Sequence, residues 1–349
     1  MSAAEEQAGV EIRAARLLLA RLGVTPEQLL AEPSTRQSIA PTFDAYIDQV
    51  SQAVAPGTRR VYATYWQRIR EDWGGRRLDE PTPLEIKQFV LRMRGQVVQR
   101  RNSRGGRTAA EHVISAFRCL YRHAVADGFI AAADNPATKV AKPRRLASTR
   151  RAIPDRHLAQ INDIAATTGN DPDLDTLLLR LHTETACRRG GALALRRCDL
   201  DAEQCLVRLR EKGETTRWQP VSPTLMTQLL LHVEERGDAT PNGQILRYRT
   251  GKPLTTRRYD RLWARIGKHL PWVAAQQVST HWLRHTTLTW VERNFGYGVA
   301  RAYAGHNGRG DAGTTTTYIR ADLHEVARAL AALTGEAHPL LDGPTNRQD

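Results

Sequence analysis

The chain has 349 residues, of which 41% are hydrophobic, and carries a formal net charge of +14. This length is enough for two compact domains, and the composition excludes a disordered or fibrous protein. The positive charge predicts a polyanionic partner, and nucleic acid is favoured over membrane because no apolar run approaches roughly 20 residues. A basic but unspecific surface is the alternative interpretation.

The four cysteines, Cys119, Cys187, Cys198 and Cys205, show neither C-x-x-C spacing nor a histidine at metal-ligand distance. We expect free thiols in the protein core rather than zinc ligands, and neither a metal nor another cofactor. The N-terminus has no signal-peptide pattern. The sequence therefore predicts a reduced, cytoplasmic protein.

Residues 1–40 are predicted to form an N-terminal helical extension. A helix is expected at Glu11–Leu22, where Gly23 can end it, and a second short helix opens at residues 25–27. From residue 41 to residue 138, apolar residues recur at helical spacing in four successive stretches, which predicts a four-helix domain.

The polar faces of this four-helix domain are rich in arginine. Solvated helix faces are usually mixed in sign, so the imbalance favours a surface that faces DNA. The residues that we expect nearest to phosphates are Arg59, Arg60, Arg101 and Arg104.

Residues 139–152 are predicted to be a basic linker. Within it, the stretch KVAKPRRLASTRR carries six basic side chains and no acid, and Pro143 interrupts any helix. A solvated tether and a strap across the DNA backbone are both consistent with this pattern. Arg144 and Arg145 are the candidate DNA contacts.

A second domain is predicted at residues 153–335, followed by a polar tail at 336–349. Helices are expected from residue 153 onward and then at 173–182, 225–235, 255–270 and 321–333. Strands at 204–210 and 215–221 are joined by a turn at 211–214, which puts Lys212 at a hairpin tip. The helix at 255–270 carries Arg257 and Arg258 as further candidate DNA contacts.

Two segments of this domain carry the chemistry. The first, residues 185–201, contains Arg188 on a loop-to-helix turn. In the second, His281 and Arg284 are three residues apart and are expected on one face of a first helical turn, which predicts a phosphate site. Gly305-His306 and the isolated Tyr318 follow.

Together these segments resemble the motifs of the tyrosine recombinases, the phage integrase family. The first matches T-G-x-R-x-[GS]-E-x-x-x-L-x-W-x-D-I-D over most positions, and the second matches H-x-L-R-H, then G-H, then T-T-x-x-Y. The resemblance implies a mainly α protein with a small antiparallel β-sheet. Its helical core-binding (SAM-like) domain precedes an integrase-type catalytic domain with the DNA breaking-rejoining fold.

The resemblance also implies a metal-independent mechanism. The two arginines would clamp the nonbridging oxygens of a phosphodiester, the histidines would donate hydrogen bonds or accept a proton, the lysine would protonate the leaving oxygen, and the tyrosine would form a 3′-phosphotyrosyl bond. The implied catalytic residues are Arg188, Lys212, His281, Arg284, His306 and Tyr318.

Three departures from the family pattern concern the geometry of the site. Gly191 stands where the family usually has an acid, and Ala186 stands where it usually has a glycine. The acid is expected to buttress the active site, so its absence predicts either a looser site or another residue in its place. The separation of His306 and Tyr318, 12 positions, is longer than usual.

The resemblance implies a double-stranded DNA recombination site as substrate and a tetrameric synapse, with an accessory DNA-bending or directionality factor as a further partner. We favour docking of the 321–333 helix on a neighbouring protomer, with packing on its own domain as the alternative. A bacterial or phage-derived, nucleoid-associated protein is expected. The alternative functions are a type IB topoisomerase-like enzyme and a catalytically inactive, recombinase-derived DNA-binding protein.

Overall fold

The computed structural model describes residues 16–21, 25, 40–96, 106–144, 150–211, 215–237, 240–305 and 322–341. It divides the chain into two compact units, Met1–Ala147 and Ser148–Asp349. Residues 16–21 are helical, and the rest of the predicted N-terminal helices lies outside the described residues. No helix in the described part of the chain is long and apolar enough to cross a membrane.

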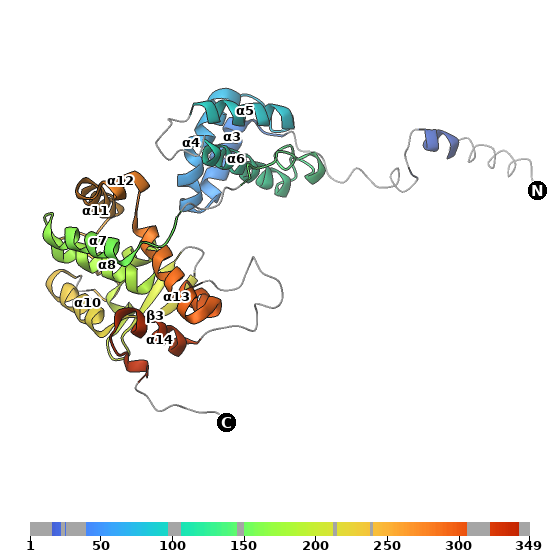
Figure 1. The fold of residues 1–349 in the computed structure, drawn as a ribbon. Helices are drawn as coiled ribbons and strands as arrows, with labels where there is room; N and C mark the ends of the chain where they lie inside the picture. Colours follow the sequence, from blue (N-terminus) through green and yellow to red (C-terminus); the bar gives the residue numbers. More distant parts are fainter. Residues whose placement is uncertain are drawn as a thin grey trace, which may run out of the picture. The chain divides into compact units, whose positions relative to one another are not determined.

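The described residues from 40 to 144 form four α-helices, as the apolar spacing predicts. They are α3 (Phe43–Ala53), α4 (Pro56–Trp73), α5 (Pro83–Gly95) and α6 (Arg107–Ala126), and the short 3-10 helix η1 (Ala132–Asp134) follows them (Figure 1). Thr82 and Glu85 form a capping box at the start of α5, which satisfies two backbone N–H groups.

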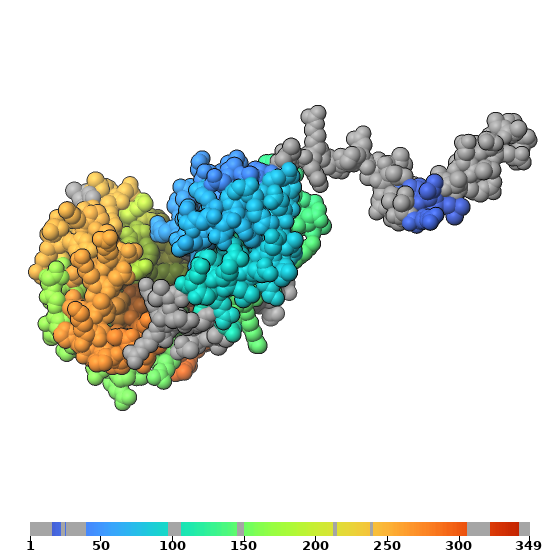
Figure 2. All heavy atoms as spheres, turned by 90° about the horizontal axis from the view of Figure 1, so that it is seen from above, coloured from blue at the N-terminus to red at the C-terminus, as the bar shows by residue number. Residues whose placement is uncertain are grey.

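Aromatic side chains fill the core of this first unit. The rings of Phe43, Trp73, Phe89 and Phe117 pack with centroid distances between 5.2 and 6.4 Å. Figure 2 shows the blue-to-cyan segment that includes α4 and α5 at the surface of the unit. Arg59 and Arg60 lie on α4 and are exposed, so the core does not occupy their side chains.

The second unit consists of helices around a small sheet. Its helices are α7 (Asp155–Thr167), α8 (Pro172–Thr185), α9 (Arg189–Leu193), α10 (Pro223–Arg236), α11 (Thr256–His269), α12 (Pro271–Gln276), α13 (Thr280–Tyr303) and α14 (Leu323–Thr334), with the 3-10 helices η2 (Arg197–Asp199) and η4 (Pro339–Leu341). Its strands are β1 (Leu200–Asp201), β2 (Leu206–Glu211) and β3 (Thr215–Pro220). The mainly α class with a small antiparallel sheet is thereby confirmed.

The sheet has the antiparallel order β1-β2-β3. In β2, side chains alternate across the sheet, and Val207, Leu209 and Glu211 all face inward and are buried. Glu211 pairs with Thr215 at the end of the ladder. The prediction that Glu211 belongs to the turn was wrong, because the alternation of β2 continues through it.

Helix α8 lies at the centre of the second unit and packs against α7, α10 and α13 (Figure 1). Helix α14 packs on α13, β3 and α8 of its own chain, and its buried Val326, Ala329 and Leu330 lie in one cluster with Tyr303. Beyond α14, Glu336 forms an ion pair of 2.5 Å with Arg180 of α8. In the isolated chain, therefore, the C-terminal helix covers its own domain.

Candidate active site

The turn that leads into the candidate site begins where α8 ends. Ala186 follows α8 with φ of 48° and ψ of 23°, a left-handed conformation that glycine adopts most easily. This backbone explains why a glycine is usual at this position. The buried His182 holds the turn through two contacts of its ring. Its Nδ1 lies 3.1 Å from the Cys187 carbonyl oxygen, and its Nε2 lies 3.0 Å from the Tyr259 hydroxyl.

Arg188 is fixed by Glu211 of β2. The Arg188 backbone N–H donates to Glu211 Oε1 at 2.5 Å, and Arg188 Nη1 donates to Oε2 at 2.9 Å. The Glu211 side chain is fully buried, whereas 38% of the Arg188 side chain is exposed. One edge of the guanidinium is therefore held by the protein, and donors remain for a ligand in solvent.

Arg284 lies on α13 and is buried. Its guanidinium donates to the backbone carbonyl oxygens of Ala186 and, at 2.8 Å, of Ala304. These two bonds connect the turn before Arg188 to the end of α13. Burial lowers the pKa of Arg284 to about 10, and the nearby charges of Arg188 and Arg217 act in the same direction. Arg284 therefore stays positively charged at neutral pH.

Arg217 of β3 completes the group. Its Nη2 donates to the Thr185 carbonyl oxygen at 3.2 Å. Gly305, with φ of 66°, lies so close that an added β-carbon would be 2.5 Å from both Cδ and Nε of Arg217. Gly305 is therefore required by both its backbone conformation and this contact. We call Arg188, Arg217, Arg284 and Glu211 the arginine cluster.

The arginine cluster has an excess of positive charge. Glu211 raises the pKa of both Arg217 and Arg284, and Arg188 lowers both, although burial is the largest effect on each. Glu211 thus bonds to Arg188, and its single negative charge also acts on Arg217 and Arg284. Such a cluster attracts an anion and can stabilise negative charge that develops on it.

His281 lies in the first turn of α13 and is exposed. Desolvation of the part of its ring that is covered lowers its pKa, and the positive charges of Arg150 and Arg284 add to this effect. His285, one turn further, lies 3.0 Å from the Thr289 hydroxyl through Nδ1. His281 is therefore neutral near pH 7 and open to a ligand, whereas His285 has a partner within its own helix.

Three predicted catalytic residues, Lys212, His306 and Tyr318, lie outside the described residues. Two of them directly follow residues of known position. Lys212 comes after Glu211, and His306 comes after Gly305, which touches Arg217. The structure thus brings Arg188 and Arg284 together and leaves the other three positions as predictions.

The candidate DNA contacts fall into three groups. Four arginines are exposed: Arg59, Arg60, Arg144 and Arg257. Arg101, Arg104 and Arg145 lie outside the described residues. Arg258 is only 5% exposed and is the exception.

Arg258 belongs to the core of the second unit. Its guanidinium donates to Asp175 Oδ1 at 2.7 Å, to Asn170 Oδ1 at 2.9 Å and to the Asp171 carbonyl oxygen at 3.0 Å. Arg265 donates to the other oxygen of Asp175 at 2.6 Å. These bonds tie α11 to the start of α8, so the assignment of Arg258 to DNA is corrected to a structural role.

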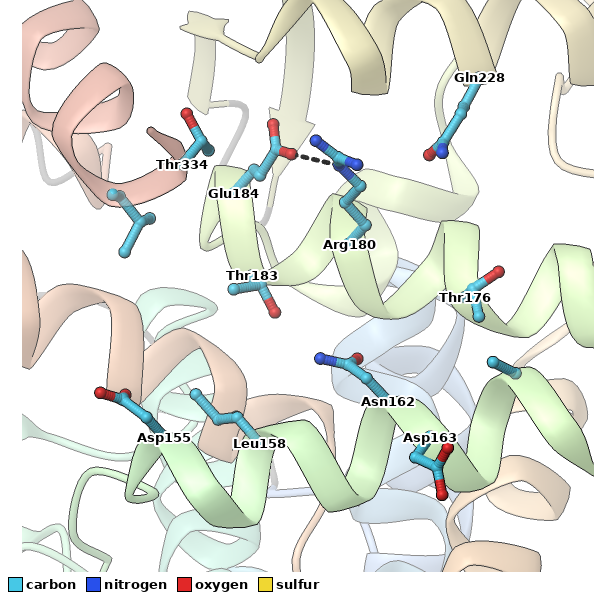
Figure 3. Close-up of a pocket in the computed structure, with 12 residues that line it drawn as sticks. Asp155, Leu158, Asn162, Asp163, Thr176, Arg180, Thr183, Glu184, Gln228 and Thr334 are labelled. Carbon is cyan, nitrogen blue, oxygen red and sulfur yellow. Dashed lines mark hydrogen bonds and ion pairs between the residues drawn. The ribbon is translucent and has the colours of Figure 1, made fainter. Parts of the chain in front are cut away.

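A pocket of about 650 Å³ lies between α7 and α8 and reaches α10 and α14 (Figure 3). Arg180 and Glu184 form an ion pair of 2.6 Å in its wall. The residues that line it include none of the arginine cluster. In the described ranges, no group of three or more histidine, cysteine, aspartate or glutamate side chains could hold a metal ion.

Sequence reasoning missed two members of the arginine cluster, Glu211 and Arg217. A signal for Glu211 was present, because Val207, Leu209 and Glu211 alternate and so share the inward face of β2. The residues E-K-G-E at 211–214 are typical of a turn, so Glu211 was assigned to the turn instead of the strand. Arg217 gave no comparable signal, since exposed arginines are common in strands next to turns.

Comparison with known proteins adds three findings. The Phage integrase family matches residues 152–324. Tyrosine recombinase XerC of Pseudomonas aeruginosa (strain PAO1) is 26% identical over 307 residues, which cover 88% of this chain and 91% of that protein. Tyrosine recombinase XerC of Chlamydia caviae is 30% identical over 154 residues, 43% of this chain and 47% of that protein.

Solved structures with a similar fold are also integrases. A lambda integrase tetramer bound to a Holliday junction aligns with a TM-score of 0.58 and 16% identity, covering 81% of this chain and 78% of that one. The Tn1549 transposon integrase in complex with a circular intermediate DNA aligns with a TM-score of 0.59 and 15% identity, covering 79% of this chain and 97% of that one.

Proposed function

The chain belongs to the phage integrase family of tyrosine recombinases, and from this premise we propose how its residues carry out site-specific recombination of DNA. The observation that carries the proposal is the arginine cluster. Arg188 and Arg284 come from segments 96 positions apart in the sequence, yet they lie close enough for the charge of Arg188 to lower the pKa of Arg284, together with burial. A cluster of this kind suits the phosphodiester group of DNA.

The proposed reaction is a transesterification. The Tyr318 oxygen attacks phosphorus, its proton passes to a histidine, the bond from phosphorus to the 5′ oxygen breaks, and Lys212 protonates the leaving oxygen. The product is a 3′-phosphotyrosyl bond and a free 5′ hydroxyl. Attack by a 5′ hydroxyl of another strand reverses the steps and completes the exchange, so no cofactor is consumed.

Arg188 and Arg284 would stabilise the negative charge on the nonbridging oxygens in the transition state. Their guanidinium groups are already oriented by protein bonds, so little reorganisation is needed when the phosphate binds. The open edge of Arg188 is the part that we assign to the phosphate.

His281 and His306 would bond to the same phosphate or accept the tyrosine proton. The lowered pKa of His281 keeps its imidazole neutral at pH 7, which leaves a nitrogen able to accept a proton. Because protonation removes that acceptor, we expect cleavage to slow as the pH falls through the lowered pKa of His281. The pH dependence of single-turnover cleavage, compared between wild type and His281→Gln, measures this.

The proposed substrate is a double-stranded recombination site, and the active assembly is a tetramer on DNA. The lambda integrase tetramer bound to a Holliday junction supports this arrangement by its similar fold. Docking of α14 on a neighbouring protomer, which the family resemblance implies, would have to replace the contacts that α14 makes with α13 and β3 of its own chain. An accessory DNA-bending or directionality factor remains part of the proposal.

The exposed Arg59, Arg60, Arg144 and Arg257 are proposed to contact the DNA backbone, together with Arg101, Arg104 and Arg145. Since its substrate is DNA, we propose that the recombinase works in the cytoplasm at the nucleoid.

A covalent-capture experiment tests the proposal. DNA fragments retained by Tyr318→Phe are sequenced to find the site, and a duplex nicked beside the cleavage point is then offered to each variant. The short strand with the 5′ hydroxyl dissociates after cleavage, so the covalent complex accumulates. We expect an adduct from wild type and none from Tyr318→Phe, while Tyr297→Phe, at an exposed tyrosine of α13, keeps it.

Each alternative predicts a different result. Tight binding without an adduct from wild type would indicate an inactive DNA-binding protein. An adduct without joining of two distinct duplexes would indicate a topoisomerase-like enzyme. An adduct that survives in Tyr318→Phe would refute the assigned nucleophile.

A further inference from the structure

Glu211 fills the space beside Gly191. A β-carbon added at Gly191 would lie 3.1 Å from Glu211 Cγ and 3.4 Å from Glu211 Oε1. The first contact is tighter than carbon atoms ordinarily make. A side chain at position 191 and the present position of Glu211 therefore compete for the same space.

We propose that Glu211 is a positioning residue for Arg188, and that its carboxylate takes from β2 the place that an acid at position 191 would take from α9. The inference rests on the proposed catalytic role of Arg188. The absence of an acid at position 191 is thus a relocation of the acid, not its loss.

The bonds of Glu211 show what it positions. One carboxylate oxygen accepts from the Arg188 backbone, which fixes the start of α9, and the other accepts from the Arg188 guanidinium. The pair therefore sets both the location of the residue and the direction of its side chain. Within the described ranges, Glu211 is the carboxylate that bonds to Arg188.

The burial of Glu211 makes this bond sensitive to substitution. Its side chain is fully buried beside Arg188, and its charge also acts on Arg217 and Arg284. An amide in its place would keep the shape but remove the one negative charge of the arginine cluster. Since charged hydrogen bonds are stronger than neutral ones, the amide would hold Arg188 less firmly.

The position of Glu211 in the sequence adds a second consequence. Glu211 is the last residue of β2, and Lys212 follows it directly. A bond that fixes Glu211 to Arg188 also fixes the point from which the segment with Lys212 starts. The relocated acid thus ties the end of β2 to the arginine side of the site.

Moving the acid back tests the proposal. Glu211→Gln, Glu211→Ala and the double variant Gly191→Glu with Glu211→Ala are compared with wild type in single-turnover cleavage of the captured DNA site. The double variant has the same net charge as wild type. The matched control is Gly190→Glu with Glu211→Ala, because a β-carbon at Gly190 meets nothing within 4 Å and its side chain does not enter the same space.

We expect Glu211→Ala and Glu211→Gln to slow cleavage by roughly 100-fold, with little change in DNA affinity, because a displaced catalytic group lowers the rate more than the binding. The Gly191→Glu double variant should recover at least about ten-fold of this loss, and the Gly190→Glu double variant should not. Glu203→Gln, at an exposed acid near β2, should cleave like wild type.

Cleavage at the wild-type rate by folded Glu211→Gln would overturn the inference, as would equal rates for the two double variants. Thermal unfolding of each variant verifies that it is folded, and Glu211→Gln is the variant expected to disturb the fold least. No adduct from wild type would refute the proposed function itself, and the inference would fall with it.

Discussion

Arg188 and Arg258 both bind a fully buried carboxylate, yet the two pairs have opposite surroundings. Arg188 bonds to Glu211 and leaves 38% of its side chain exposed, whereas Arg258 bonds to Asp175 and leaves 6%. Arg258 has further protein partners in Asn170 and the Asp171 backbone, and Arg265 shares its carboxylate. The same kind of ion pair therefore lies in the proposed active site in one case and joins two helices in the other.

The difference lies in the donors that remain. A guanidinium has five N–H donors, and the contacts of Arg258 occupy it with protein acceptors, while Arg188 keeps donors that face solvent. Burial of a carboxylate thus does not by itself identify a functional pair. Between Arg188 and Arg258, the exposure of the arginine edge distinguishes the two roles, and the following substitutions test that distinction. Arg284 is as buried as Arg258, and its proposed role rests instead on its place in the arginine cluster.

The largest expected effect is on stability, at Asp175. Asp175→Ala leaves the buried Arg258 and the partly buried Arg265 without their counter-ion and should lower the free energy of unfolding by about 3–5 kcal/mol. Chemical denaturation measures the change. The control is Asp173→Ala, two positions earlier on α8, where the carboxylate is 82% exposed and the loss should be at most about 1 kcal/mol. Similar losses of stability in both variants would show that the buried pair of Asp175 and Arg258 has no special structural role.

Gly305→Ala should affect both stability and cleavage. The new methyl group would be strained at φ of 66° and would press on Arg217, so we expect a loss of about 2–4 kcal/mol and slower cleavage. Gly335→Ala is the matched control, because its φ is 72° but a β-carbon there meets nothing within 4 Å. Normal cleavage by Gly305→Ala would show that the packing of Arg217 does not matter for the site.

Acid should loosen the turn behind Arg188. Burial lowers the pKa of His182 to about 4 from the ordinary 6.5. Between these values the unfolded chain binds the proton and the folded chain does not, so stability falls as the pH falls from 6.5 toward 4. The loss from this group should be about 2 kcal/mol at pH 5.

Denaturation of wild type and His182→Gln at pH 7 and pH 5 measures the contribution of His182. The difference between the two pH values should be smaller in the variant. An unchanged difference would mean that another group causes the loss.

The smallest expected effect concerns a third kind of arginine, which is exposed and has no carboxylate partner among the residues that the structure describes. Arg60→Ala should weaken DNA binding several-fold and reduce the slope of log affinity against log salt by about 1. Arg68→Ala is the control on the same helix, because Arg68 already pairs with Glu71 at 2.9 Å. If Arg60→Ala keeps the slope of wild type, Arg60 does not contact a DNA phosphate.

Periodicity predicted the helices and the hairpin because burial of one face leaves a regular pattern in the sequence. The family motifs likewise predicted Arg188 and Arg284 as candidates. The predictions that were wrong concerned residues whose roles depend on contacts between distant segments. Arg258 looked like part of a basic helix face, and only the packing of α11 against α8 brings Asp175 to it, 83 positions away.

The role of Glu211 was missed for a different reason. Its local sequence is typical of a solvated turn, while its position depends on the absence of a side chain at Gly191, 20 positions earlier. Neither residue is informative alone. The relation between them can be inferred only when the missing acid at position 191 is considered together with the inward-facing acid at position 211.

The most direct test of the account compares Arg188→Ala with Arg258→Ala in two assays. For Arg188→Ala we predict a roughly 10²–10³-fold loss of single-turnover cleavage and a loss of unfolding free energy below about 2 kcal/mol. For Arg258→Ala we predict a loss of about 3–5 kcal/mol in stability and normal cleavage by the folded fraction. If both variants lose stability and cleavage in the same proportion, the distinction between the two arginines is wrong.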